Sequence, residues 1–347
     1  MGISELIFNV GLLFIMMVPG IILKKCKFVS ADFGKGISNL VLYIAQPSLI
    51  VYAYMACESS FSDIWQNCLV TLVLSIIAHV IFSSVALLLF RKQPESKRKM
   101  LRLVTIFANA AFMGIPLIQA MLGAEAAIYA SIYNITFNFF LWTLGVHLCT
   151  VRDGEDLDGD GEHTSRDRFI SAHRNMKKET SLLRVLLHPV TIASAVGVTL
   201  LVSGVNIPVL DGAGLGIIPE VFAMLKGLVA PLSMIVIGLR LADIDMSGTL
   251  SDRGMYLFLV LRHAVLPLAV VTVIWAAIAV GIPIGRTAAL VTIILAATPA
   301  ASSSTMFAEK YDCDAGYTSR LVIISTVISI ATMPAVLAVA NLLLFPA

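Results

Sequence analysis

Charged residues are scarce in this chain. Only 13% of its 347 residues are Asp, Glu, Lys or Arg, whereas 58% are hydrophobic. Too few polar side chains remain to cover a water-soluble globule of this size. Hydrophobic runs of about 20 residues, the length that crosses roughly 30 Å of hydrocarbon as a helix, recur along nearly the whole chain. The composition therefore excludes a soluble protein and predicts an all-α integral membrane protein.

Several functional motifs are also absent. No HExxH, Gly-x-Ser-x-Gly or pair of buried acidic residues appears, so the sequence disfavours an intramembrane enzyme. We expect no cofactor, and no nucleic acid as a partner. The first hydrophobic run lacks a basic region before it and a cleavage site after it, which predicts a retained helix and not a signal peptide. The cysteines lack Cys-x-x-Cys spacing and indicate neither a zinc site nor a disulfide framework: Cys26, Cys57, Cys68, Cys149 and Cys313.

Charged residues and Gly- or Pro-marked breaks divide the hydrophobic sequence into segments. Lys and Arg gather in the first, third and fifth loops between these segments and are nearly missing from the even loops, with Arg286 the exception. Because cytoplasmic loops carry an excess of Lys and Arg, we expect the odd loops in the cytoplasm and both termini outside a cell membrane. Ten transmembrane spans are predicted, at about 6–24, 36–57, 64–90, 101–122, 125–150, 184–204, 217–241, 254–281, 286–308 and 317–345.

The only long polar segment, 151–183, divides the ten spans into two sets of five. We predict a first five-helix repeat at 1–150, a cytoplasmic polar linker at 151–183 and a second five-helix repeat at 184–347. Five spans in each copy force the copies into opposite orientations, as in many secondary transporters. Pro47 and Pro231 lie 184 positions apart in similar local sequences, and the same offset nearly carries Pro116 onto Pro299. The predicted fold is therefore two inverted repeats with crossed broken helices 4 and 9.

Spans 4 and 9 each carry a helix breaker beside small or amide side chains in mid-membrane. Gly114 and Pro116 lie in span 4, and Pro299 lies in span 9. Proline removes an N–H and clashes with the preceding turn, so both helices should kink or open there. Freed backbone groups are tolerated in hydrocarbon only where they line a polar cavity. We therefore expect a binding site where the two helices cross, with half-helix N-termini offering N–H groups to an anion.

Neutral polar side chains near these breaks are candidate substrate ligands, and each has a packing alternative. The Asn109 amide is placed to donate to a carboxylate or, alternatively, to a neighbouring helix. Small hydroxyl side chains after the span 9 break either line the site or permit close helix packing. The full candidate set is Asn109, Gln46, Ser302, Ser303, Ser304, Asn134 and Asn138.

Ionisable side chains inside the spans are few. Lys226 in span 7 and Arg262 in span 8 lie about 13 Å along their helices, where each either snorkels to the nearer interface or attracts the anion. A lack of deep acidic residues disfavours proton or sodium exchange through paired buried carboxylates. The acidic residues closest to mid-membrane lie near predicted span ends: Glu5, Glu125, Glu220 and Glu309.

Acidic residues in the polar linker match part of a calcium-binding loop. Gly161 stands at position 6 of the pattern, but position 12 is Asp and not the usual bidentate Glu. A solvated acidic linker is therefore the preferred interpretation. The matching carboxylates are Asp156, Asp158, Asp160 and Asp167.

Taken together, the motifs resemble those of the auxin efflux carrier family, as a prokaryotic PIN-like member. Residues 109–116, Asn-Ala-Ala-Phe-Met-Gly-Ile-Pro, are similar to the family's Asn-x-x-x-Met-Gly-Ile-Pro, and Phe307-Ala-Glu-Lys-Tyr follows Pro299 at the expected distance. Residues 230–239 and the His188-Pro pair are also similar. Two departures argue against auxin itself as the substrate: Ala300 stands where plant carriers have Gln, and His188 stands where Asn is usual.

The resemblance implies an elevator-type carrier, in which spans 1, 2, 6 and 7 form a scaffold and spans 3–5 and 8–10 form a moving transport domain. It implies a small organic anion, a mono- or dicarboxylate, as substrate, with Asn109 contacting it and Pro116 and Pro299 at the crossover. The lipid bilayer is the other expected partner, and a homodimer through the scaffold helices is compatible with this arrangement. Two alternatives stay open: a sodium-coupled anion symporter of the bile-acid-carrier type, and a non-transporting receptor.

Overall fold

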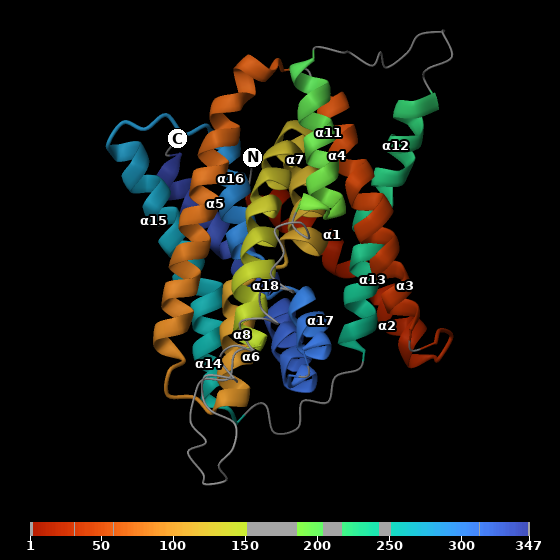
Figure 1. The fold of residues 1–347 in the computed structure, drawn as a ribbon, viewed down its shortest axis with the longest axis vertical. Helices are drawn as coiled ribbons and strands as arrows, with labels where there is room; N and C mark the ends of the chain where they lie inside the picture. Colours follow the sequence, from red (N-terminus) through yellow and green to blue (C-terminus); the bar gives the residue numbers. More distant parts are fainter. Residues whose placement is uncertain are drawn as a thin grey trace, which may run out of the picture.

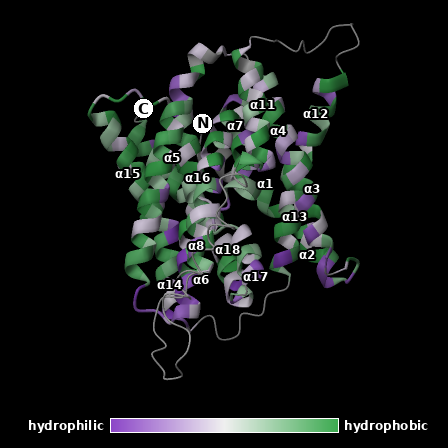
Figure 2. Ribbon diagram, in the orientation of Figure 1, coloured by the Kyte–Doolittle hydropathy of each residue, from purple (hydrophilic) through white to green (hydrophobic). Residues whose placement is uncertain are grey.

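The computed structural model describes residues 3–30, 32–57, 59–150, 186–203, 217–242, 251–311 and 313–345. Within these ranges every regular element is helical, and the only β-type pairing is an isolated antiparallel bridge between Ala108 and Ala300. Most helices run along the long axis of the molecule (Figure 1). Hydrophobic residues cover most of their length, and hydrophilic residues gather toward the lower end around α2, α6 and α17 (Figure 2).

The described helices before residue 151 include three π-helical turns. They are α1 (Ile3–Ile15), α2 (Val18–Lys25), α3 (Phe33–Leu40), η1 (Val41–Ala45), α4 (Gln46–Met55), α5 (Phe61–Leu89), α6 (Glu95–Ile106), η2 (Ala110–Gly114), α7 (Ile115–Phe140), η3 (Leu141–Gly145) and α8 (Val146–Thr150). The described elements after residue 185 are α11 (Pro189–Val202), α12 (Ile217–Gly227), α13 (Val229–Leu241), α14 (Arg253–Val260), η4 (Leu261–Val265), α15 (Leu266–Ala279), α16 (Arg286–Ala297), α17 (Ser303–Lys310) and α18 (Ala315–Leu344).

Seven helices among the described residues are long and apolar enough to cross a membrane. Two further apolar helices, at Pro189–Leu200 and Arg286–Ala297, are shorter. The chain is therefore a multi-pass membrane protein that is helical in its described part. The seven ranges are Phe8–Lys25, Phe33–Met55, Ile64–Leu89, Ala110–Thr150, Ile217–Leu241, Arg253–Ala279 and Ala315–Leu344.

The run Ala110–Thr150 contains both the end of the fourth predicted span and the whole of the fifth. Its backbone leaves helical geometry at Gly123, where φ is 81° and ψ is −165°. A side chain would be strained at that positive φ, whereas glycine adopts it readily. The chain therefore bends at Gly123, between the two predicted spans.

Three of the four π-helical turns in the described residues come directly before a proline in the first turn of the next helix. Pro47 follows η1, Pro116 follows η2 and Pro267 follows η4. A proline ring clashes with the carbonyl four residues earlier, and that carbonyl lies inside the π turn in each case. The wider turn relieves the clash, so these helices continue past proline with a local change of pitch. The exception is η3, which no proline explains.

Close packing of α2 against α13 depends on two glycines. A Cβ atom added at Gly238 would overlap the main-chain oxygen of Met17, and one added at Gly20 would overlap the main-chain oxygen of Ile235. Glycine at both positions therefore lets the two backbones approach directly, as small residues do between membrane helices.

We expect Gly238→Ala to destabilise the protein, because the new methyl group meets backbone and not a flexible side chain. The expected loss is about 1–3 kcal/mol, measured as a lower Tm of the purified protein in detergent. Gly227→Ala is the matched control, since a Cβ there has nothing within 4 Å. Equal Tm values for the two variants would show that α2 and α13 do not pack as described.

Candidate functional site

Two helices are interrupted at the same place in the hydrophobic interior. Helix α6 ends at Ile106, and Phe107 takes an extended conformation that leads through Asn109 into η2. Helix α16 ends at Ala297, and an extended Thr298 leads through Pro299 toward α17. Each interruption frees main-chain N–H and C=O groups that a continuous helix would pair internally.

The two interrupted segments pair with each other. The N–H of Asn109 donates to the carbonyl of Pro299 at 2.7 Å, and the N–H of Ala301 donates to the carbonyl of Phe107 at 2.8 Å. These bonds flank the bridge between Ala108 and Ala300, so the segments cross antiparallel. We call residues 107–109 and 298–302, with this pairing, the crossing.

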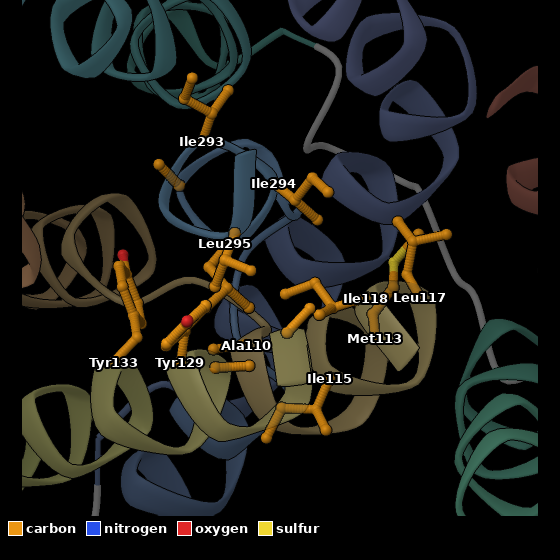
Figure 3. Packing of buried hydrophobic residues seen from close by; sticks show 14 of the residues in the cluster. Ala110, Met113, Ile115, Leu117, Ile118, Tyr129, Tyr133, Ile293, Ile294 and Leu295 are labelled. Atoms are coloured by element: carbon orange, nitrogen blue, oxygen red, sulfur yellow. The ribbon is translucent and has the colours of Figure 1, made fainter. Parts of the chain in front are cut away.

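Hydrophobic side chains pack tightly beside the crossing. In Figure 3, Ile294 and Leu295 of α16 are directed toward residues of η2 and α7, Ala110 and Ile118 among them. Gly114 at the end of η2 adjoins the same surface, because a Cβ there would overlap a methyl group of Leu295 and lie 3.3 Å from Thr298 Cγ2. Glycine at position 114 therefore allows α16 to lie directly against η2.

Arg262 holds the C-terminal ends of both interrupted helices. Its guanidinium donates from Nε (3.1 Å) and Nη2 (2.8 Å) to the carbonyl of Thr298, and from Nη2 to that of Ala296 at 2.8 Å. Nη1 donates to the carbonyl of Thr105 at 3.3 Å. The side chain is 0% exposed, and its guanidinium carbon lies 5.3 Å from the centre of the Phe82 ring. Arg262 therefore reaches inward to the crossing and not outward to an interface.

A chain of hydrogen bonds connects the crossing to α18. The N–H of Ala300 donates to Ser325 Oγ at 2.9 Å, and His263 Nε2 lies 2.9 Å from the same oxygen. His263 Nδ1 lies 3.0 Å from Thr332 Oγ1. Since Ser325 accepts from Ala300, its hydroxyl is free to donate to Nε2 of a neutral imidazole. Sequence reasoning missed Ser325 and Thr332, because single hydroxyls in a hydrophobic helix give no signal of their own.

Two side chains from other helices donate to the backbone of the crossing and of η2. Gln46 Nε2, at the start of α4, donates to the carbonyl of Ala111 at 2.6 Å. Arg240 Nη1, near the end of α13, donates to the carbonyl of Ser302 at 2.8 Å. Gln46 was a sequence candidate, whereas Arg240 was not, because its position near a span end is typical of an interfacial arginine.

Several candidate side chains are buried with unpaired polar atoms. Asn109 Nδ2 at the crossing and Ser304 Oγ at the start of α17 have no hydrogen-bond partner among the described residues. Asn134, on both side-chain atoms, and Asn138, at Nδ2, are in the same condition. An unpaired buried polar group costs about 1–3 kcal/mol, which a bound polar ligand or water would remove.

Some of the candidates predicted from the sequence do not contact the crossing directly. Asn134 and Asn138 flank Phe137 in α7, and the Phe137 ring packs against Phe107 with 5.7 Å between ring centres. Their turn of α7 therefore lies beside the crossing. The Lys226 ammonium instead lies 3.5 Å from the centre of the Tyr52 ring. The calcium-loop candidates Asp156, Asp158, Asp160 and Asp167 lie outside the described residues.

These features define a class of protein. In its described part the chain is a multi-pass helical membrane protein with two broken helices that cross in its interior, a feature that membrane transporters share. The chain belongs to the membrane transport protein family, whose model matches residues 6–337. This confirms the family that the sequence motifs indicated, the auxin efflux carrier-like transporters. Members of this family are membrane transport proteins.

A curated relative points the same way. An uncharacterized transporter of Methanothermobacter thermautotrophicus is 24% identical over 337 residues, which cover 96% of this chain and 97% of the relative. The similarity therefore extends over the whole fold and is not confined to the crossing.

Proposed function

We propose that this protein is a secondary carrier for a small organic anion, a mono- or dicarboxylate. The observation that carries the proposal is the pairing of the two broken helices by Asn109 with Pro299 and by Ala301 with Phe107. Helix starts leave N–H groups without intrahelical partners and carry a partial positive charge, so η2 and α17 beside the crossing suit a carboxylate. The unpaired Asn109 amide supplies a further donor.

The proposed architecture is ten spans in two inverted five-helix repeats, 1–150 and 184–347, joined by the linker 151–183. Spans 1, 2, 6 and 7 would form the scaffold, and spans 3–5 and 8–10 the transport domain. The contacts of the crossing support this division. Arg262, His263 and Ser325 all belong to proposed transport spans, whereas Gln46 and Arg240 belong to scaffold spans 2 and 7 and make one bond each.

Transport would proceed by an elevator movement, in which the transport domain carries the crossing past the scaffold. The two scaffold bonds, from Gln46 to Ala111 and from Arg240 to Ser302, would then belong to one position of the moving domain and break in the other. The distribution of Lys and Arg supports a cell membrane location with the odd loops in the cytoplasm and both termini outside.

A thermal-shift screen of small mono- and dicarboxylates on the purified protein tests the proposal. A ligand at one hundred times its Kd stabilises the folded state by about 2.7 kcal/mol, enough for a clear rise in Tm. We expect at least one carboxylate to raise the Tm and to be taken up by proteoliposomes. The amide analogue of each acid is the matched control, since it has a similar shape without the charge. A panel in which acids and amides behave alike would argue against an anion carrier.

A further inference from the structure

The two interruptions create two helix C-termini in the hydrophobic interior, those of α6 and α16. The last carbonyls of a helix have no intrahelical partner and carry a partial negative charge. In transporters with broken helices, such ends and the unwound carbonyls near them are where the coupling cation binds. The partner of these carbonyls therefore bears directly on which ion, if any, the carrier needs.

In this chain the carbonyls already have a cationic partner. Carbonyls from both broken helices, those of Thr105, Ala296 and Thr298, accept hydrogen bonds from the guanidinium of Arg262. A guanidinium in a protein stays protonated, so the positive charge at this position is permanent. Unlike a bound ion, this charge belongs to a side chain and cannot dissociate. Arg262 lies in η4, in the middle of a hydrophobic helix.

The surroundings of Arg262 leave that charge without a carboxylate counter-ion in the described part of the chain. The Phe82 ring lies against the guanidinium, and the neighbouring His263 makes its own bonds to Ser325 and Thr332. The N-terminal ends of η2 and α17 lie on the same crossing, with Asn109 Nδ2 and Ser304 Oγ unpaired. The C-terminal carbonyls of α6 and α16 are thus paired with a cation of the chain itself, and the N-terminal N–H groups of η2 and α17 remain to bind an anion.

We infer that Arg262 is a fixed internal cation that occupies the position a coupling Na⁺ would take, so that anion binding and transport need no Na⁺. This inference rests on the proposed carrier function and adds to it the ion requirement. It also assigns Arg262 a positioning role: the guanidinium holds the ends of α6 and α16 together and supplies the positive charge that a bound anion neutralises.

The first test uses the wild-type protein. Uptake of the carboxylate that gives the largest thermal shift is measured in proteoliposomes with Na⁺, K⁺ or N-methylglucamine as the only external cation. We expect equal rates in all three, and we expect NaCl and KCl to give the same Tm at equal concentration. Uptake that requires Na⁺, or a Tm that rises with Na⁺ and not with K⁺, would overturn the inference and leave the carrier function intact.

The second test removes the internal cation. In Arg262→Ala the freed carbonyls should accept a small cation, so millimolar guanidinium or Na⁺ should raise the Tm of the variant and not that of the wild type. Anion affinity should fall about tenfold or more, because a charged group makes the stronger kind of hydrogen bond and its removal leaves buried carbonyls unpaired. Arg286→Ala, which removes an exposed arginine bonded to Asn341, is the matched control and should behave as the wild type.

The outcomes separate the two claims. If no carboxylate is bound or moved under any cation, the proposed function fails, while selective stabilisation of Arg262→Ala by guanidinium still supports the internal cation. If Arg262→Ala does not fold, the wild-type comparison of Na⁺ with K⁺ decides alone. If Arg262→Ala folds and binds the anion with unchanged affinity, Arg262 has no role in anion binding and the inference fails.

Discussion

Asn109→Asp is expected to abolish uptake of the organic anion, with a loss of affinity of at least about 100-fold. The Asn109 amide is buried at the crossing, and its Nδ2 atom has no partner among the described residues. The main-chain carbonyl of Asn109 accepts from the N–H groups of Met113 and Gly114, so residue 109 stands at the N-terminal end of η2. The substitution replaces a donor with a negative charge of nearly the same shape, at the place proposed for the carboxylate.

The measurement is the Kd of the best carboxylate from the screen, with uptake in proteoliposomes alongside. Asn109→Ala should give a smaller loss, about tenfold, because it removes one hydrogen bond to a charged group without adding repulsion. Asn341→Asp makes the same change at the end of α18, beside the exposed Arg286, and should leave the affinity unchanged. If Asn109→Asp folds and binds the anion as the wild type does, the substrate does not lie at η2.

Arg240→Gln should depopulate the conformation described here by about tenfold or more. A hydrogen bond from a charged donor contributes about 1.5–3 kcal/mol, and this one joins α13 to the carbonyl of Ser302 at the crossing. In an elevator movement the bond exists only while the transport domain is in this position. Its loss therefore shifts the population toward the other position and does not act on the substrate directly.

Spin labels at two exposed positions report this population. In a background without the native cysteines, Lys25→Cys places a label at the end of α2 and Lys310→Cys places one at the end of α17. The distribution of distances between the two labels then reports the position of the proposed transport domain relative to the scaffold. Arg240→Gln should enlarge the second peak of the distribution. Arg253→Gln, at the exposed start of α14, is the control and should leave the distribution as in the wild type. A single unchanged distance in both variants would count against a moving domain.

The sequence indicated an interruption in each of spans 4 and 9, but its exact place only in span 9. Pro299 lies in the span 9 break, whereas the span 4 break lies at residues 107–109 and the helix continues past Pro116 through the wider η2 turn. Which group pairs with a freed carbonyl depends on tertiary contacts between helices far apart in the chain. Arg262 is separated from Thr105 by 157 positions in the chain, and no spacing rule connects them. Local sequence therefore left its role open between an interfacial and an interior cation.

Other parts of the fold could not be predicted from the sequence for similar reasons. The contacts of Arg240 with Ser302 and of Ala300 with Ser325 depend on the relative height of helices far apart in the chain, which hydropathy does not encode. The bend at Gly123 was readable only as a boundary between spans, because its positive φ has no signature beyond glycine itself. The division into ten spans and two inverted repeats stays a prediction.

The most direct test of the central claim is an experimental structure of the protein with its best carboxylate bound. We predict density for the carboxylate at the N-terminal ends of η2 and α17, within hydrogen-bond distance of Asn109 Nδ2, while Arg262 remains bonded to the carbonyl of Thr298. Density for the ligand at any other place, with the N-terminal ends of η2 and α17 filled by packed side chains, would contradict the account.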